Sequence, residues 1–293
     1  MCNDFCFVTI AVGEEYVQCA KRLAKDLETH AKGRGFVVFT DDPSRFESNN
    51  NVKSLIYEPL HKSIYLDKAT VVEKTLEFHQ AAVFIDADSR ILSDIPEGIS
   101  FNEGITCLSC CSLAKNCAVR INSRLRIRLP FTFLMSIPFK FIKYMRFLPH
   151  VNREKVRKIV QKVMLVEKVC GDKGVDPDKL RFFNEFLFAV KIDKKAREDF
   201  FDAYHQIAEE FESGGFFAGE NVPLSIAALV VGLPVYHTVE VGDPLRSFKY
   251  FKDRIVNGKL RRGDRLTQTE RMFLEERGRA AEFGIEKNAN GAD

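Results

Sequence analysis

Two carboxylates stand one residue apart directly after an apolar run, an arrangement that suits a hard divalent cation. Asp86 and Asp88 follow the run at residues 82–85, and a bend at its end would let both side chains face one ion. Mg²⁺ and Mn²⁺ prefer oxygen ligands and can bridge the oxygens of a diphosphate. A cation held there would neutralise charge on a departing nucleoside diphosphate. The pair therefore indicates a metal site for a diphosphate-containing substrate.

The spacing alone is weak evidence, because Asp is common in this chain. Eighteen Asp in 293 residues would give about one such pair by chance. A second copy, Asp176-Pro177-Asp178, lies in a loop that no apolar run precedes, and its residue types indicate a turn and a helix cap. The elements around Asp86 and Asp88 must therefore decide between a site and a coincidence.

The first hundred residues alternate between short apolar runs and amphipathic stretches, which indicates strands and helices in turn. Continuous apolar runs are typical of strands buried on both faces. The short connections predict a parallel sheet covered by helices, whose ligands bind beyond the carboxyl ends of the strands. The expected strands lie at 5–12, 36–40, 52–57 and 82–85, and the expected helices at 14–30 and 69–78.

The second half of the chain continues the α/β pattern after a basic, Phe-rich segment. We expect helices at 152–169, 194–211 and 222–231, strands at 186–192 and 233–239, and a charged surface helix and tail from Asp264 onward. The predicted fold class is therefore α/β, with a mostly parallel central sheet flanked by helices and interrupted by a basic, Phe-rich insertion.

The context of the two carboxylates resembles a known family. Residues 83–88, Val-Phe-Ile-Asp-Ala-Asp, are similar to the segment of GT-A fold glycosyltransferases in which a strand delivers an Asp-x-Asp motif to the donor diphosphate. Further similar segments occur in the family's order and cover residues 5–100 and 180–240. They lie at 7–11, 13–16, 38–41, 67–68, 183–189 and 219–224.

The resemblance implies a nucleotide-sugar donor held partly by the protein and partly through Mn²⁺ or Mg²⁺. It implies Asp86 and Asp88 as metal ligands, with Asp88 the better direct ligand. The donor would contact Thr9, Ala11, Tyr16, Asp41, Lys68, Asp86 and Ala87. Several of these have a plainer interpretation: Thr9 and Tyr16 as packing residues, Asp41 as a turn residue beside Pro43, and Lys68 as an exposed residue on an amphipathic helix.

The resemblance also implies where an acceptor would react. Glu220 would act as general base in an inverting reaction or as a stabilising carboxylate in a retaining one, with Asn184 nearby. Helix capping is the alternative for Glu220, and a cap or turn role is the alternative for Asn184. His237 is the only late candidate for a third metal ligand, and it falls within an expected strand.

These implications divide the chain into four expected segments. They are a nucleotide-sugar-binding half at 1–104, a basic and aromatic insertion at 105–179, an acceptor-side half at 180–263, and a charged helix and tail at 264–293.

The insertion carries most of the positive charge of the protein. From Lys115 to Lys168 there are fourteen Lys or Arg and two acids, in a chain whose formal net charge is only +3. Arg and Lys interleaved with Phe, Leu and Tyr suit contact with an anionic membrane or a lipid-linked acceptor. A solvated basic face over ordinary core Phe is the plain alternative. Nucleic acid is not expected as a partner, because no nucleic-acid-binding motif accompanies the segment.

The location follows from what the chain lacks. No basic region precedes the first apolar run, and the longest uncharged apolar run, at 129–139, contains two prolines and is too short to span a bilayer. The eight Cys are expected to be reduced thiols. We therefore expect a cytoplasmic protein that can touch the inner face of a membrane.

Three functions are consistent with these patterns. The first is a metal-dependent glycosyltransferase that acts on a glycan, glycolipid or lipid-linked acceptor. The second is a nucleotidyltransferase on a similar sheet, although the chain lacks a Gly-rich N-terminal signature. The third is a non-catalytic protein that binds anionic surfaces through residues 115–168. No Gly-x-Gly-x-x-Gly or Walker loop follows the first strand, which argues against a dehydrogenase and a P-loop enzyme.

Overall fold

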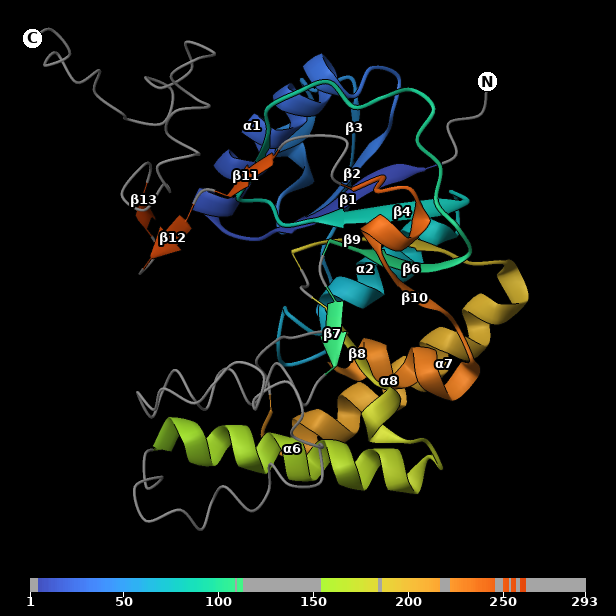
Figure 1. Ribbon diagram of the computed structural model, residues 1–293. Coiled ribbons are helices and arrows are strands. Elements are labelled where there is room, and N and C mark those ends of the chain that lie inside the picture. The colour runs from blue at the N-terminus through green and yellow to red at the C-terminus, as the bar shows by residue number, and fades with distance from the viewer. Residues whose placement is uncertain are drawn as a thin grey trace, which may run out of the picture. The chain divides into compact units, whose positions relative to one another are not determined.

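Seven strands form the main sheet of the computed structural model, in the order β10-β6-β9-β4-β1-β2-β3 (Figure 1). The structure describes residues 5–108, 110–112, 154–183, 186–216, 222–245, 250–252, 254–256 and 259–261. The strands of the main sheet are β1 (Cys6–Ala11), β2 (Phe36–Thr40), β3 (Val52–Ile56), β4 (Ala81–Ile85), β6 (Gly104–Cys107), β9 (Leu187–Lys191) and β10 (Val235–His237).

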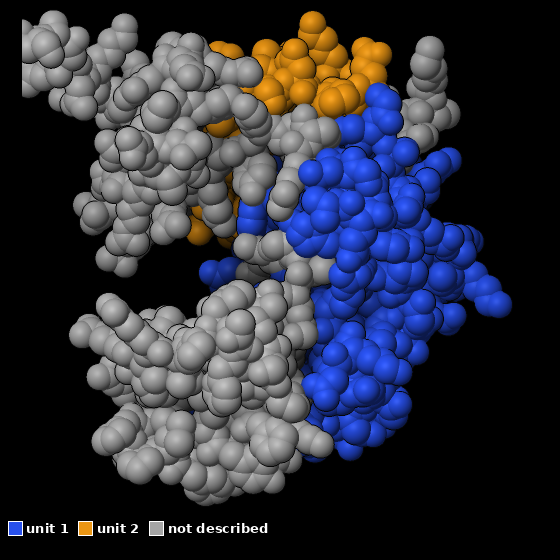
Figure 2. Space-filling view, in the orientation of Figure 1, with its two compact units in different colours: residues 1–8, 58–85, 98–247 blue, residues 9–57, 86–97, 248–293 orange. Residues whose placement is uncertain are grey.

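The chain divides into two compact units, each made of segments that are distant in the sequence (Figure 2). Unit 1 contains residues 1–8, 58–85 and 98–247, and unit 2 contains residues 9–57, 86–97 and 248–293. Strand β1 begins in the first unit and ends in the second. Asp86 and Asp88 belong to unit 2, as do the ends of β1 and β2.

In unit 1, the strands form because their residues are apolar on both faces. Every residue of β4 is buried, and so are the first four of β9. β4 pairs in parallel with β1, and β10 pairs in parallel with β6. β9 runs antiparallel to both β4 and β6, and its Phe188 lies opposite Phe84, with the two rings stacked 5.4 Å apart.

Gly104 allows β6 and β10 to approach closely. Its φ is +124°, and a Cβ at this position would lie 2.5 Å from the carbonyl oxygen of Pro234. Only glycine combines this backbone conformation with this approach. The amide of the next residue, Ile105, donates a hydrogen bond of 2.8 Å to the same carbonyl.

The described residues of unit 1 form four α-helices: α2 (Asp67–Leu76), α6 (Glu154–Asp172), α7 (Lys194–Ser213) and α8 (Val222–Val231). α2 packs on β4 and on α7, and α7 packs on α8 and α6. The Asp193 side chain caps α7 by accepting from the amide of Ala196. Unit 1 also holds β7 (Cys110–Ser112) paired with β8 (Arg181–Phe183), and the 3-10 helices η3 (Pro177–Lys179) and η4 (Thr238–Val241).

Unit 2 is built around helix α1 (Glu14–His30). Its apolar stripe is buried, and it packs on β2 and on the short strand β5 (Ser89–Ile91). β2 and β3 pair in parallel. β5 pairs antiparallel with β11 (Tyr250–Lys252), which comes from the C-terminal part of the chain. The 3-10 helix η1 (Pro43–Phe46) and the hairpin of β12 (Arg254–Val256) and β13 (Lys259–Arg261) complete the unit.

The predicted fold class is confirmed as mixed α/β with a mostly parallel sheet flanked by helices. The strand expected at 186–192 is present as β9, but its antiparallel direction was not predicted, because an apolar run carries no information about its direction. The expected elements before residue 110 appear within two residues at most ends. The GT-A assignment and the four predicted segments stay predictions. Most of the basic insertion and the expected C-terminal helix lie outside the described residues.

Within the part of the chain that the structure describes, no helix is both long and apolar enough to cross a membrane.

Two histidines form a buried polar chain between α2 and α7 in unit 1. Nε2 of His61 lies 3.3 Å from Nδ1 of His205, whose Nε2 lies 2.8 Å from the carboxylate of Glu73. On the other side, Nδ1 of His61 lies 3.9 Å from the carboxylate of Glu212. The Asp67 carboxylate accepts hydrogen bonds from the amides of residues 60 and 61. The buried His61 ring therefore contacts His205 and Glu212 and packs against the ring of Tyr204.

We expect His61 to make stability depend on pH. Burial lowers the pKa of His61 below its ordinary value of 6.5, so the folded chain binds fewer protons here than the unfolded chain. The stability is complete above pH 6.5 and is lost as the pH falls below that value toward the folded pKa. Scanning fluorimetry at pH 7.5 and 5.5 should show a smaller fall in Tm for His61→Gln than for the wild type. An equal fall would contradict this assignment.

Candidate active site

A tight turn carries the two predicted metal ligands. Asp86 follows β4 directly, and the amide of Ser89 donates a hydrogen bond of 2.9 Å to the Asp86 carbonyl. Asp86 is half-buried, Ala87 is buried, and Asp88 is 8% exposed. The bend after the strand, which the predicted metal site requires, is therefore present. We call residues 86–89 the carboxylate turn.

The segment that follows the carboxylate turn is anchored to helix α1 by a buried ion pair. Nε of Arg90 donates 2.6 Å to Oδ2 of Asp26, and its Nη2 donates 2.9 Å to Oδ1. The amide of Ile91 donates a third hydrogen bond, of 3.1 Å, to the same carboxylate. Asp26 is 5% exposed and Arg90 is 7% exposed. Neither residue was predicted, because an ion pair 64 positions apart leaves no local pattern.

Beyond the ion pair, the same segment is held at two more places. β11 pairs with β5 such that Phe251 lies opposite Arg90. Further on, His30 at the end of α1 contacts the Asp94 side chain at 2.7 Å, and its carbonyl accepts from the amide of Ile95 at 2.7 Å. The loop after the carboxylate turn is thus tied to α1 along its length.

The predicted nucleoside-binding residues lie in the same unit, and one contact joins two of their segments. The amide of Gly13, in the turn between β1 and α1, donates 3.1 Å to Oδ2 of Asp41 at the end of β2. Thr40 donates 3.2 Å to the other oxygen of Asp41. The structure therefore brings together the β1–α1 turn and the acidic end of β2, where the Asp41 side chain is exposed.

The other predicted donor residues of β1 and α1 differ in their exposure. Thr9 and Ala11 are fully buried, and the Thr9 hydroxyl has no hydrogen-bond partner among the residues that the structure describes. Tyr16 is 41% exposed. Donor contacts by these residues stay predictions.

We expect Gly13→Ala to destabilise the protein by about 1–3 kcal/mol, because the backbone conformation favours glycine. Gly13 has φ 82° and ψ 159°, and nothing lies within 4 Å of a Cβ built there. The cost should therefore come from backbone strain rather than from a clash. Chemical denaturation would measure it, with Gly98→Ala, which has no positive φ and equally open surroundings, as the control. Equal stability of the two variants would refute the assignment.

Arg45, which was not predicted as a site residue, lies in η1 shortly after Asp41. Its guanidinium donates hydrogen bonds of 2.9 and 3.0 Å to the carboxylate of Glu14, in the first turn of α1. This contact, with a further hydrogen bond from Gln18, lowers the pKa of Glu14 to about 2. Glu14 is therefore ionised at any pH at which the protein would be assayed.

Lys68 lies in unit 1, in the first turn of α2, and is only 6% exposed. Its ammonium lies 5.2 Å from the ring centre of Phe84 and 5.4 Å from that of Tyr65. The alternative of an exposed Lys on an amphipathic helix is therefore wrong. Phe84 precedes Asp86 by two residues, so the Lys68 ammonium lies beside the end of β4, the strand that leads into the carboxylate turn. A donor contact by Lys68 stays a prediction.

The remaining predicted residues are placed only in part. His237 ends β10 in unit 1, where its Nδ1 accepts from the amide of Val239 and its own amide donates to Glu240. Hydrogen bonding from Arg181, and then from the His237 amide, lowers the pKa of Glu240 to about 2. Asn184 and Glu220 lie outside the described residues. Asp176 caps η3 by accepting from the amide of Asp178, so this second Asp-x-Asp is a cap, as predicted.

The carboxylate turn offers two candidate oxygen ligands for a cation, Asp86 and Asp88. Among the residues that the structure places, no three His, Cys, Asp or Glu side chains are grouped to hold a metal ion. A turn with two carboxylates supplies the ligands that Mg²⁺ or Mn²⁺ uses when diphosphate oxygens and water complete its shell.

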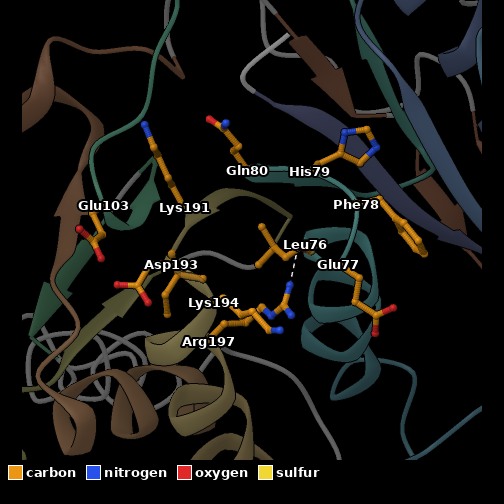
Figure 3. Close-up of a pocket in the computed structure, with 11 residues that line it drawn as sticks. Leu76, Glu77, Phe78, His79, Gln80, Glu103, Lys191, Asp193, Lys194 and Arg197 are labelled. Carbon is orange, nitrogen blue, oxygen red and sulfur yellow. Dashed lines mark hydrogen bonds between the residues drawn. The ribbon is translucent and has the colours of Figure 1, made fainter. Parts of the chain in front are cut away.

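A pocket of about 660 Å³ lies in unit 1 at the opposite end of β4 from Asp86 (Figure 3). Residues 76–80, before β4, line it together with the end of β9, the start of α7 and Glu103. Arg197 points across it and donates to the carbonyl of Leu76. Its three cations, Lys191, Lys194 and Arg197, are matched by three acids, Glu77, Glu103 and Asp193. Because these charges balance, the pocket has no excess of positive charge that would favour the phosphates of a nucleotide.

Comparison with known proteins leaves the family open. No family model matches the chain, and no curated protein matches it. One similar solved structure is described as a WbbM bifunctional glycosyltransferase in its apo state, with a TM-score of 0.42 and 9% sequence identity. The match covers 79% of this chain and 38% of that one, so this chain spans well under half of its length. The proposed function therefore rests on the residues of the candidate site and their contacts.

Proposed function

We propose that the protein is a glycosyltransferase that uses a nucleotide-sugar donor and a divalent metal. The observation that carries the proposal is the carboxylate turn, which directly follows a fully buried strand of a mostly parallel sheet. Ligands of such sheets bind beyond the carboxyl ends of the strands. The contact of Gly13 with Asp41, in the same unit as the turn, supports a neighbouring nucleoside site.

In this proposal each segment of the donor half has one task. Asp88 and Asp86 hold Mn²⁺ or Mg²⁺, which when bound would offset the charge of the leaving diphosphate. Asp41 and the residues around the β1–α1 turn bind the nucleoside, since an exposed carboxylate can accept from ribose or base donors. The buried cation of Lys68 adds positive charge beside the end of β4.

On the acceptor side we propose Glu220 as the reacting carboxylate and Asn184 as a second residue of the reaction. Glu220 would remove the proton of the acceptor hydroxyl in an inverting reaction, or stabilise the positive charge at the anomeric carbon in a retaining one. The acceptor we propose is a glycan or a lipid-linked sugar.

Turnover of nucleotide sugars tests the proposal. The protein is incubated with a panel of donors in Mn²⁺, Mg²⁺ or EDTA, and released nucleoside diphosphate is measured with and without lipid-linked acceptors. Metal-dependent release from one donor supports a glycosyltransferase. Release of pyrophosphate from nucleoside triphosphates instead would identify a nucleotidyltransferase. No turnover by any of these would favour the non-catalytic protein.

The proposal includes a cytoplasmic protein with peripheral contact to an anionic membrane through residues 115–168. Helix α6 is the described part of this segment. It buries a stripe of Val160, Val163, Val166 and Val169, while Arg157 and Lys158 are exposed. Lys158 and Lys168 pair with acids on α6 itself, at 2.7 and 2.8 Å. The helix is therefore less basic than the sequence alone indicates, and residues 113–153 must supply most of the attraction.

We expect the protein to sediment with anionic liposomes at low salt and to be released as salt is raised, because screening weakens attraction between separated charges. Reversing the charge of Arg124, Arg126 and Arg128 should reduce the bound fraction. Neutral phosphatidylcholine liposomes are the control. Equal binding to neutral and anionic liposomes, or unchanged binding by the charge-reversed variant, would exclude an electrostatic contact of these basic residues with an anionic membrane.

A further inference from the structure

We propose that Asp26 is a positioning residue for the carboxylate turn, acting through Arg90. The inference rests on the proposed function, because it assumes that Asp86 and Asp88 hold the metal. Asp26 lies 60 positions before that turn, on helix α1 of the same unit. Its role is to keep the turn in one orientation before metal and donor bind.

The geometry of the Asp26–Arg90 contact restricts the orientation of the Arg90 side chain. Both oxygens of Asp26 accept from the two nitrogens of Arg90 at 2.6 and 2.9 Å, a fork geometry that fixes the guanidinium plane. The third hydrogen bond, from the amide of Ile91 at 3.1 Å, fixes the backbone of β5 as well as the side chain. One carboxylate therefore holds both the side chain and the main chain two and three residues after Asp88.

Stability alone gives little reason for this pair. The surrounding face of α1 is apolar and buried, including Leu23, Ala24 and Leu27. In such a place, well-packed apolar residues often stabilise as much as a buried ion pair, since two charges must lose their water. The pair fixes geometry through three hydrogen bonds, two to the guanidinium and one to the main chain, which suits it to positioning.

The carboxylate turn needs such support. It is held by β4 on one side and by β5 on the other, and β5 has only three residues, paired with the three-residue β11. A rigid attachment directly after Asp88 lets the turn keep one arrangement before a cation binds.

The test separates positioning from stability with two variants. Asp26→Asn leaves the buried Arg90 without its charged partner and can lower stability severely. The second variant, Asp26→Leu with Arg90→Met, removes both charges and keeps the apolar volume. We expect its Tm to lie within a few degrees of the wild type, while Mn²⁺ affinity in the presence of nucleoside diphosphate falls about 10- to 100-fold. Mn²⁺ binding is measured by electron paramagnetic resonance of the free ion.

Asp94→Asn is the matched control. It removes the charge of the side chain that contacts His30 in the same loop, but the Asp94 side chain is 88% exposed, so Mn²⁺ affinity should be unchanged. Wild-type Mn²⁺ affinity in the double Asp26/Arg90 variant would overturn the inference and leave the proposed function standing. Absence of Mn²⁺ binding by the wild type itself would overturn both.

Discussion

Replacing Asp88 with Asn should lower metal-dependent turnover of the nucleotide sugar by about 10²- to 10³-fold, because a metal ligand next to the leaving group contributes several kcal/mol to stabilising the transition state. Asn keeps the size of the side chain and loses its charge. Asp88 is 8% exposed, so a substitution of the same shape should preserve the carboxylate turn. The rate is measured at saturating donor over a range of Mn²⁺ concentrations.

The second Asp-x-Asp provides the control for this variant. Asp178 is exposed and takes no part in the proposed site, and Asp178→Asn leaves intact the cap that Asp176 forms. Its turnover should equal that of the wild type. If both substitutions, or neither, reduced the rate, the assignment of Asp88 as the metal ligand would be wrong.

Phe84→Ala should reduce the free energy of unfolding by about 3–5 kcal/mol, the usual cost of removing a buried aromatic ring. Phe84 is 1% exposed, stacks on Phe188 of β9 and lies beneath the ammonium of Lys68. The substitution therefore removes core packing and the ring that faces a buried cation. Urea denaturation followed by circular dichroism measures the loss.

Phe78→Ala is the comparison, because Phe78 is 63% exposed. It should change the free energy of unfolding by less than about 0.5 kcal/mol. A loss for Phe84→Ala no larger than that for Phe78→Ala would show that the junction of β4 and β9 is not the core that the structure places there.

Much of the fold could be predicted, because its central elements have strong local patterns. The buried runs of β1, β2 and β4 and the helical spacing of α1 each indicate one type of element. The antiparallel direction of β9 depends on where the chain returns after the insertion, which no local pattern encodes. Strands β5 and β11 have three residues each and show no periodicity, so no local pattern predicts them.

The site was predictable where it depends on residues close in sequence. The turn at Asp86 and the contact of the β1–α1 turn with Asp41 follow from strand ends that meet at one edge of a sheet. The pair of Asp26 and Arg90 and the burial of Lys68 were not predicted. All three are charged residues that sequence patterns assign to the surface. Asp26 and Arg90 compensate one another for the lost water, and the Lys68 ammonium faces two aromatic rings.

The most direct test of the central claim is the thermal stability of the protein with nucleotide sugars, with and without Mn²⁺, for the wild type, Asp88→Ala and Asp178→Ala. A ligand present at a hundred times its Kd stabilises the folded state by about 2.7 kcal/mol, so one donor should raise the Tm of the wild type and of Asp178→Ala by several degrees. The increase should require Mn²⁺ and be absent in Asp88→Ala. An increase that persists without metal or in Asp88→Ala, or no increase with any donor, would contradict a metal-bridged donor site at the carboxylate turn.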